Sequence, residues 1–401
     1  MLLVFMLFGF DLWGQTAPFD SGNFTVNELL LDDGRALSYK AFDKIYYVGN
    51  VEDSLYQYMN IYVPEGVDDS APIILRTFSN NFYSSHPKAP SAVDITGMAL
   101  ARGYVVCVIG VRGCNSFDVR NVYQLKKKKS VLKGQEIVYT GKMPAPVLDI
   151  KSAVRFLRAN DQHIPGSCGR IVAVGVGTNS MLMMMLGVSA NAPDFEPFLQ
   201  SMGACAATDD VFATACLSPY FITGGASMDG GFQLTASHDD YLRSVLMNSA
   251  RAEAAMGRHI PDSLGAEYFA DTFVSDDITD YMVDFDVRRF AAGIARHSGK
   301  RIQLIDTAYY FAGGLADSIG VDIRKAMCDP FVFLGRHALS PCPHWLLSHG
   351  ATENPAMFPL TYRLSCLLRE AMMDVDLRIP FGRQSAKGHD YYELLQWIDS
   401  L

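Results

Sequence analysis

A strand, a tight glycine turn and a helix follow one another in residues 170–189, a pattern able to present a nucleophile. The β-branched run 171–174 favours a strand. A turn with Gly175 and Gly177 comes next, and the apolar run Met181–Leu186 is typical of a buried helix. Such a turn can lift a serine hydroxyl above the carboxyl edge of a parallel sheet, where it attacks an ester carbonyl. Here that position holds Gly177, so the backbone pattern is present and the hydroxyl is not.

The same pattern has two other interpretations. An ordinary βαβ step and the start of a dinucleotide-binding fold also join a strand to a helix through glycines, and Gly175 and Gly177 alone do not separate the three. A hydroxyl does follow at Ser180, three residues beyond the tip of the turn. Three residues are almost a full helical turn, so Ser180 would serve as a displaced nucleophile only if the whole turn shifted.

The elements that would position this turn follow a β/α order. Alternating residues predict antiparallel strands at Ala36–Phe42, Lys44–Val48 and Tyr58–Pro64. The apolar runs Pro72–Arg76 and Gly103–Gly110, with a helix at Ser91–Ala101 between them, are typical of strands buried on both faces of a parallel sheet. Helical spacing in Val147–Asn160 then leads into the strand of the glycine turn. This alternation predicts an α/β fold with a doubly wound sheet.

Composition limits the partners of the chain. Its 401 residues, 49% hydrophobic and 19% charged, can bury a large core, either as one α/β domain or as a core with an inserted cap. A net charge of −9 argues against nucleic acid or an anionic membrane as a partner. We interpret the basic run Lys126–Lys129 as a solvated loop surface. The sequence carries no cofactor motif and no metal-ligand spacing, and it does not specify an oligomeric state.

The start of the chain resembles a secretory signal. Met1–Phe10 is nearly all apolar, although no Lys or Arg precedes Arg35, so the usual positive segment is missing. Ten apolar residues are too few to span a bilayer, and no later run is long enough. We therefore expect an exported protein, periplasmic or extracellular, in which residues 1–17 are a truncated signal segment.

The eight cysteines are scattered along the chain. Several lie in apolar patterns, where an unmodified cysteine behaves as a small hydrophobic residue. An even count in an exported chain also permits disulfides, and Cys107 with Cys114 or Cys205 with Cys216 are conceivable pairs.

Motifs from about residue 45 to the C-terminus resemble the bacterial tannase family, which are α/β-hydrolases related to feruloyl esterases. They occur in the family's order at Asn60–Pro64, Gly110–Gly113, Gly141–Asp161, Ile164–Gly166, Phe195–Leu199, Asp209–Ala213, His349–Glu353 and Glu393–Asp399. The resemblance implies an α/β-hydrolase fold with a mostly parallel, doubly wound sheet and an inserted helical lid. It also implies hydrolysis of galloyl and similar aromatic esters through a serine, an acid and a histidine.

The family's nucleophile turn, Gly-Thr-Ser-Ala-Gly, is matched by Gly175–Asn179 and places the serine on Gly177. Glycine adopts the strained backbone of that position without cost, so the turn can survive loss of the serine. The last glycine of the family pattern is Asn179, which adds bulk where the strand and helix pack closely.

The resemblance also assigns the other site residues. Glu353 stands where the family has its catalytic aspartate, and His389 matches the catalytic histidine if the preceding loop is shortened. An ungapped alignment puts Ser385 at the histidine position, and His389 is then a surface histidine at a helix start. Lys300 matches a lysine that contacts galloyl hydroxyls, but its acidic partner falls on Gly314, and a solvated loop lysine is an equally good interpretation.

The expected domains follow from the same comparison. They are a signal-like segment 1–17, a first core part 18–222, a lid 223–300 and a second core part 301–401. The lid segment has helical patterns at Tyr241–Ala255 and Leu264–Phe273.

Two functions compete. The first is a catalytically degenerate tannase-like protein that binds a small aromatic ester or a glycoside-like ligand without cofactor or metal. The second is an active carboxylesterase in which a displaced serine, or a water held by His389 and Glu353, replaces the missing hydroxyl. Departures at the nucleophile, at the last glycine and at the histidine favour the first.

Overall fold

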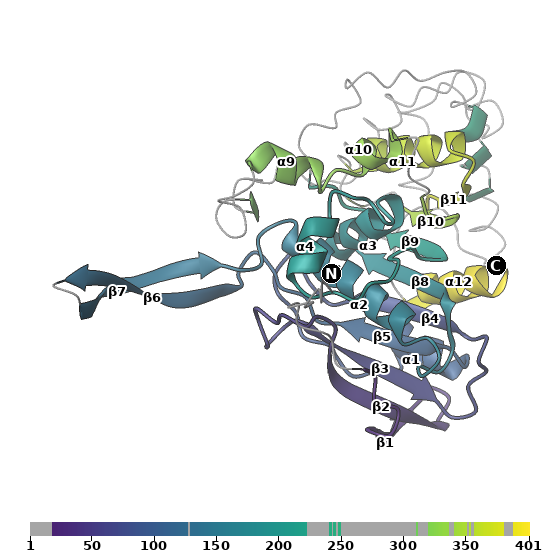
Figure 1. Ribbon diagram of the computed structural model, residues 1–401. Helices are drawn as coiled ribbons and strands as arrows, with labels where there is room; N and C mark the ends of the chain where they lie inside the picture. Colours follow the sequence, from purple (N-terminus) through teal and green to yellow (C-terminus); the bar gives the residue numbers. More distant parts are fainter. Residues whose placement is uncertain are drawn as a thin grey trace, which may run out of the picture.

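The computed structural model describes residues 18–126, 129–222, 240–242, 244–245, 248–249, 310–311, 320–336, 341–350, 353, 357–380 and 388–401. A nine-stranded sheet forms the centre of this structure, in the order β1-β2-β3-β5-β4-β8-β9-β10-β11 (Figure 1). Its strands are β1 (Thr25–Leu30), β2 (Ala36–Tyr46), β3 (Tyr58–Pro64), β4 (Pro72–Thr77), β5 (Val105–Ile109), β8 (Ser167–Val176), β9 (Ala213–Leu217), β10 (His344–Ser348) and β11 (Asp374–Arg378).

Most of this sheet is parallel. The first three strands and β5 pair antiparallel, whereas the pairs from β5 through β4, β8, β9 and β10 to β11 are all parallel. Every residue of β4, β5 and β9 is buried, as expected for parallel strands covered on both faces. The predicted doubly wound, mostly parallel sheet is therefore confirmed.

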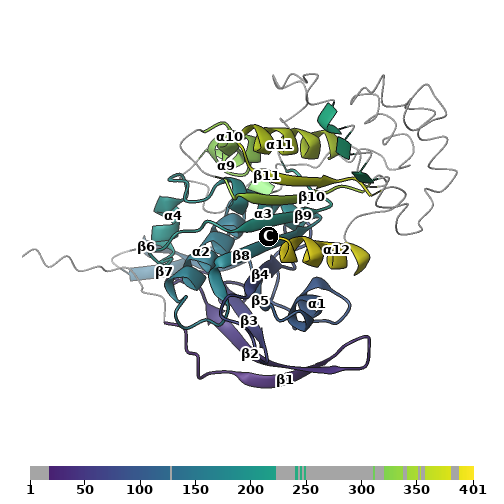
Figure 2. The same cartoon turned by 90° about the vertical axis from the view of Figure 1, so that its right-hand side faces the viewer.

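Helices cover both faces of the sheet (Figure 2). The described helices are α1 (Ile95–Ala101), α2 (Ala145–Ala159), α3 (Thr178–Val188), α4 (Glu196–Ser201), α9 (Val321–Ala326), α10 (Pro330–Leu334), α11 (Phe358–Glu370) and α12 (Gly388–Asp399). One hydrophobic cluster joins the sheet to α2, α3, α4, α10 and α11, and a second joins its other face to α1 and α12. This arrangement leaves the carboxyl ends of the parallel strands to carry a site.

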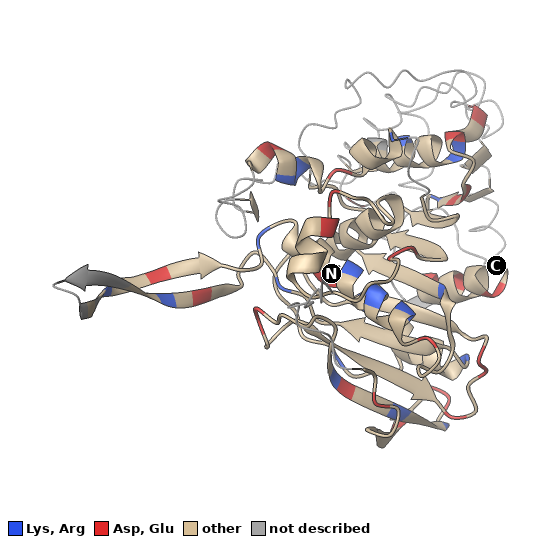
Figure 3. Ribbon diagram, viewed as in Figure 1, with Lys and Arg blue, Asp and Glu red and all other residues tan. Residues whose placement is uncertain are grey.

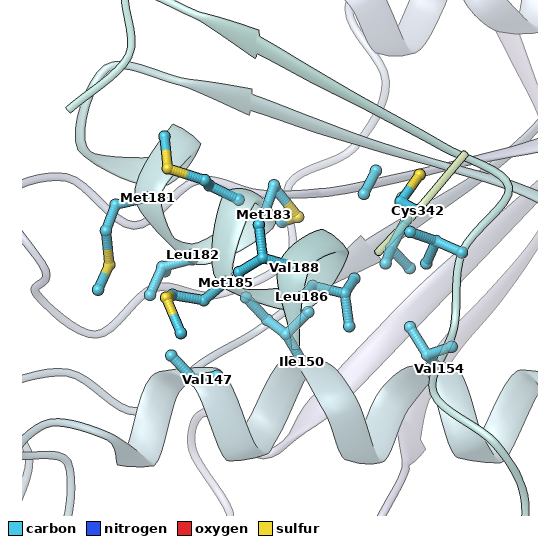
Figure 4. Packing of buried hydrophobic residues seen from close by; sticks show 14 of the residues in the cluster. Val147, Ile150, Val154, Met181, Leu182, Met183, Met185, Leu186, Val188 and Cys342 are labelled. Atoms are coloured by element: carbon cyan, nitrogen blue, oxygen red, sulfur yellow. The ribbon is translucent and has the colours of Figure 1, made fainter. Parts of the chain in front are cut away.

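The methionine-rich helix α3 is held firmly behind the glycine turn. Its residues 181–186 are all fully buried. Figure 4 shows Leu182, Met185 and Leu186 on the side of α3 that faces α2, near Val147 and Ile150. Unbranched methionine side chains fill irregular gaps well, which suits a helix enclosed on all sides. A Cβ on Gly187 would lie 2.6 Å from the Trp345 ring, so glycine is needed where α3 crosses the sheet.

Two parts of the sequence-based description need correction. Residues 36–46 form one strand, with an irregular register between Phe42 and Ile45, where we expected two strands. Lys126 and Lys129, the ends of the basic run, are not in a polar loop but belong to the paired strands of a hairpin, β6 (Phe117–Lys126) and β7 (Lys129–Tyr139). Lys127 and Lys128 lie outside the described residues. The lysines interrupt the alternation of polar and apolar residues that reveals a strand, and so concealed the hairpin.

All eight cysteines lie within the described residues, and none forms a disulfide, so the two conceivable pairs are not made. Burial raises the pKa of the thiols of Cys107, Cys216 and Cys328, which keeps them protonated. Within the described ranges, no helix is both long and apolar enough to cross a bilayer. Residues 1–17 and most of 223–300, including Leu264–Phe273, lie outside those ranges.

Candidate active site

The backbone at Gly177 has the strained geometry of a strand-to-helix turn that presents a nucleophile. Gly177 separates β8 from α3 with φ 60° and ψ −128°, a conformation that side-chain-bearing residues rarely adopt. Its N–H donates to the carbonyl of Leu217 over 2.9 Å, which ties the turn to β9. A Cβ built on Gly177 would meet no atom within 4 Å. The turn therefore has room for a side chain, but none is present.

Ser180 belongs to the support of this turn. Its side chain is fully buried, and its hydroxyl donates to the carbonyl of Gly177 over 2.6 Å while accepting from the N–H of Tyr220 over 2.9 Å. A Cβ on Gly175 would come within 2.4 Å of the Ser180 Cα, so the helix start is pressed against the strand end. These contacts argue against Ser180 as a displaced nucleophile.

Two neighbouring side chains fill space that the family pattern leaves to alanine and glycine. The Thr178 hydroxyl accepts the N–H of Asn81 over 3.0 Å, and Asn81 lies in the loop after β4. In α/β-hydrolases the corresponding loop supplies an oxyanion-hole N–H, so one donor of this loop is already occupied here. The buried Asn179 side chain donates to the carbonyl of Thr77 over 3.3 Å, which shows how its added bulk is accommodated.

Glu353 lies at the carboxyl end of β10 and is buried. Its Oε1 accepts the Ser218 hydroxyl over 2.7 Å, and its Oε2 lies 3.7 Å from Nδ1 of His349. Ser218 follows β9 with φ 53° and donates its N–H to the carbonyl of Ser348 over 2.8 Å. The carboxylate therefore lies between hydroxyl and imidazole, whereas in a catalytic triad the imidazole lies between the other two groups.

His349 is a neutral, buried histidine. Its ring packs edge-on against Phe358 with centroids 5.6 Å apart, and burial lowers its pKa to about 3. An imidazole with so low a pKa is a weak base at neutral pH. Sequence reasoning gave His349 no role, although its spacing of four residues from Glu353 in one motif was an available signal.

The side chains of the remaining predicted site residues are not among those that the structure describes. His389 lies in the first turn of α12, but its side chain is outside the description, as are Lys300, Gly314 and Ser385 altogether. Their roles stay predictions. No group of three or more His, Cys, Asp and Glu side chains within the described ranges is arranged to hold a metal ion.

Aromatic side chains from three segments meet beside the turn. Phe82 comes from the loop after β4, and its ring centroid lies 6.1 Å from that of Tyr220 and 5.3 Å from that of Tyr310. Tyr220 is linked to the turn through its N–H to Ser180. Burial raises the pKa of Tyr220 to about 12, so its hydroxyl is a neutral donor. Phe82 is fully buried, so only the partly buried rings of Tyr220 and Tyr310 can offer aromatic surface to a ligand.

Several motif residues that carried the family resemblance form buried ion pairs away from the turn. Arg112 pairs with Asp149 over 2.8 Å, and both side chains are fully buried. Lys151 donates to Asp209 over 2.8 Å and to the carbonyl of Ser189 over 2.7 Å. Desolvation lowers the pKa of Lys151, which Asp209 opposes by favouring the charged form. The residues of these motifs therefore stabilise the fold, and their presence does not indicate catalytic activity.

Solved structures with the same architecture include two bacterial enzymes. The tannase of Fusobacterium nucleatum superposes with a TM-score of 0.72 at 20% identity, over 96% of this chain and 98% of that one. The chain has the tannase fold. The tannin acyl hydrolase of Lactobacillus plantarum gives a TM-score of 0.67 at 20% identity, with the same coverage. A tannin acyl hydrolase in complex with 3,4-dihydroxybenzoate gives 0.70 at 20% identity over 96% and 98% of the two chains.

The tannase fold agrees with the expected architecture of an α/β-hydrolase, and the structural likeness extends over 96% of the chain. Neither protein-family models nor curated proteins match the sequence significantly. The likeness is thus one of fold, and the site must be judged from its own residues.

Proposed function

We propose that this protein uses a tannase fold to bind a small aromatic ester or phenolic acid and does not hydrolyse it. The observation that carries the proposal is Gly177, which keeps φ 60° and ψ −128° at the nucleophile position but offers no hydroxyl. Loss of the serine from a serine hydrolase lowers turnover by on the order of a millionfold. A scaffold that retains the turn without its reactive group is suited to binding alone.

The surroundings of the turn support the absence of catalysis. Ser180 is buried in the support of the turn, and Thr178 occupies the N–H of Asn81. Glu353 is engaged by Ser218. Three features of an ester-cleaving site are therefore altered together, beyond the lost hydroxyl.

The proposed ligand class rests on two observations. Tyr220 and Tyr310 pack against the buried ring of Phe82 and are themselves only partly buried, and aromatic rings favour offset or edge-on contact with one another. Structures of tannin acyl hydrolase with this fold hold 3,4-dihydroxybenzoate and ethyl gallate. A compact phenolic ring is therefore the favoured ligand. We also propose, from the apolar start of the chain, that the protein meets this ligand outside the cytoplasm.

A weak carboxylesterase is the second candidate, and the contact between Ser218 and Glu353 is the observation that favours it. A carboxylate could accept the serine proton or activate a water molecule, and His389 could assist. Glutamate has an ordinary pKa of about 4.3 against about 6.5 for histidine, so it is the weaker base. Such a route would be slow.

Calorimetric titration with gallate, 3,4-dihydroxybenzoate and methyl gallate tests ligand binding, with glucose as a non-aromatic control. We expect saturable binding of the aromatic compounds and at least about a tenfold loss of affinity in Tyr220→Ala, equivalent to about 1.4 kcal/mol. Tyr392→Ala is the matched control, because Tyr392 is exposed on α12. Absence of binding by all three compounds would refute the proposed ligand class.

A further inference from the structure

A buried arginine lies in the central sheet, on the face covered by α1 and α12. Arg76 belongs to β4, and Ile74, two residues earlier on the same face, is part of the hydrophobic cluster that includes those two helices. Phe82, Tyr220 and Tyr310 pack with the cluster on the opposite face. Arg76 is 6% exposed. It is therefore separated by the sheet from the aromatic rings of the proposed ligand site.

The guanidinium of Arg76 is short of hydrogen-bond acceptors. Its Nε and Nη1 atoms are buried, and neither donates a hydrogen bond to any described residue. Oδ2 of Asp94 lies 3.9 Å from Nη1, which is too far for a hydrogen bond. Burying a charged group is costly unless the group is both paired and hydrogen-bonded. The two open donors therefore indicate that an acceptor belongs at this position.

Asp94 is held in place by the start of α1. Its Oδ1 accepts the N–H of Thr96 over 2.8 Å and also accepts the Thr96 hydroxyl. Asp94 is the N-cap of α1, where a side-chain oxygen satisfies a backbone donor of the first helical turn. Asp94 therefore balances part of the charge of Arg76 from a distance, but it does not accept a hydrogen bond from Nη1.

A second cation lies close to Arg76. The guanidinium carbon of Arg76 is 4.3 Å from the centre of the Phe78 ring, and the ammonium of Lys88 is 4.8 Å from the same centre. The Tyr62 hydroxyl donates to the Lys88 carbonyl over 3.2 Å, which fixes the backbone at Lys88. Two positive charges therefore share one ring, and each attracts an anion placed beside it.

Tyr391 of α12 adds a neutral donor. It is partly buried and packs against the same hydrophobic cluster as Phe78. Burial raises the pKa of Tyr391, and the positive charge of Arg76 opposes this rise. Asp390 also raises the pKa of Tyr391, but among the described residues only Asp94 and Tyr391 act on the pKa of Arg76, which desolvation lowers. The Tyr391 hydroxyl is therefore protonated at neutral pH and lies within electrostatic reach of Arg76.

The charges of the group favour a small anion with a single charge. Arg76 and Lys88 carry two positive charges and Asp94 carries one negative charge, so a monocarboxylate makes the group neutral. A phosphate group, with about −1.5 to −2 charges at pH 7, would leave it negative. Figure 3 shows basic residues scattered among acidic ones over the described elements, and the net charge of the chain is −9. An extended polyanion is therefore disfavoured.

We propose that Arg76, Lys88 and Tyr391 bind a small monocarboxylate. Its oxygens accept hydrogen bonds from the guanidinium and from the Tyr391 hydroxyl, and the exposed ammonium of Lys88 attracts it from the solvent side. A planar carboxylate matches the fork of N–H donors on a guanidinium, and such charge-assisted hydrogen bonds are strong. Phe78 and Tyr391 are partly exposed, so the site can be reached from solvent.

Acetate tests this site without testing the aromatic one, because it has a carboxylate and no ring. The linewidth of the acetate methyl signal in NMR is followed during titration with the full chain. We expect saturable binding of acetate and none of acetamide, which has a similar shape without the charge. Arg76→Met should weaken acetate binding at least about tenfold. Lys88→Met should weaken it less, because Lys88 is exposed.

Arg170→Met is the matched control, because Arg170 also lies over an aromatic ring, 5.5 Å from the centre of Phe212. It should bind acetate as the native chain does. A second measurement needs no variant. Acetate should raise the melting temperature of the native chain above its value in sodium chloride of equal ionic strength, because a ligand that binds the folded state stabilises it.

Three results would overturn the proposal: no saturable binding of acetate, equal binding of acetamide, or unchanged acetate binding in Arg76→Met. Tighter binding of inorganic phosphate than of acetate would overturn the choice of a monocarboxylate. None of these results depends on whether an aromatic ligand binds beside Gly177.

Discussion

The hydroxyl of Ser218 donates a hydrogen bond to Oε1 of Glu353 over 2.7 Å. This carboxylate, to which the family resemblance assigns the role of catalytic acid, is thus held by a serine on one side and approached by the buried His349 on the other.

His349 should make the stability of the fold depend on pH. Its pKa is about 3 when folded and about 6.5 when unfolded, so the unfolded chain binds the extra proton first as the pH falls. Above about pH 6.5 the ionisation of His349 does not reduce the free energy of unfolding. Between about pH 6.5 and pH 3 that free energy falls by up to about 1.4 kcal/mol per pH unit.

Urea unfolding from pH 7 to pH 4 measures this dependence. In His349→Phe the free energy of unfolding should depend less on pH than in the native protein. In His163→Gln, at an exposed position, its dependence on pH should be unchanged. If His349→Phe keeps the native pH dependence, the imidazole is not held neutral.

Gly177→Ala should destabilise the fold although the site has room for a methyl group. The strained backbone costs a side-chain-bearing residue roughly 1–3 kcal/mol. Gly320→Ala is the control, since its Cβ also meets nothing within 4 Å and its φ is −55°. Equal free energies of unfolding for the two variants would show that the turn relaxes to an ordinary conformation.

Lys151→Met should lower the free energy of unfolding by roughly 3–5 kcal/mol, because it leaves the buried Asp209 without its ammonium partner. The double variant Lys151→Met/Asp209→Asn should recover part of that loss. Lys40→Met, at an exposed position, should change stability by less than about 0.5 kcal/mol. A loss below about 1 kcal/mol in the single variant would mean that Arg155 alone satisfies Asp209.

The sequence was sufficient to locate the glycine turn because its strand, turn and helix are contiguous. It also placed Glu353 after a late strand, through the order of the motifs. The contact of Ser218 with Glu353 could not be read in the same way, because it depends on β9 and β10 lying side by side. Residues 135 positions apart carry no local pattern that announces such a contact.

A clear match to a family motif also did not show that the residues of that motif take part in catalysis. Arg112 and Lys151 belong to the segments that carried the resemblance most clearly, yet each is bound to a buried carboxylate in the scaffold. The hairpin of β6 and β7 was missed for a different reason. Its short alternation is interrupted by four lysines and by a register shift after Val122, so the strands can be recognised only from their pairing.

Ester turnover by the native chain tests the central claim most directly. Purified protein is incubated with methyl gallate, methyl ferulate and p-nitrophenyl acetate, alongside Ser218→Ala, Ser180→Ala and His389→Ala. The vacant position at Gly177 predicts no turnover above buffer with any of the three esters. Saturable turnover by the native protein that is abolished by any one of these substitutions would contradict it.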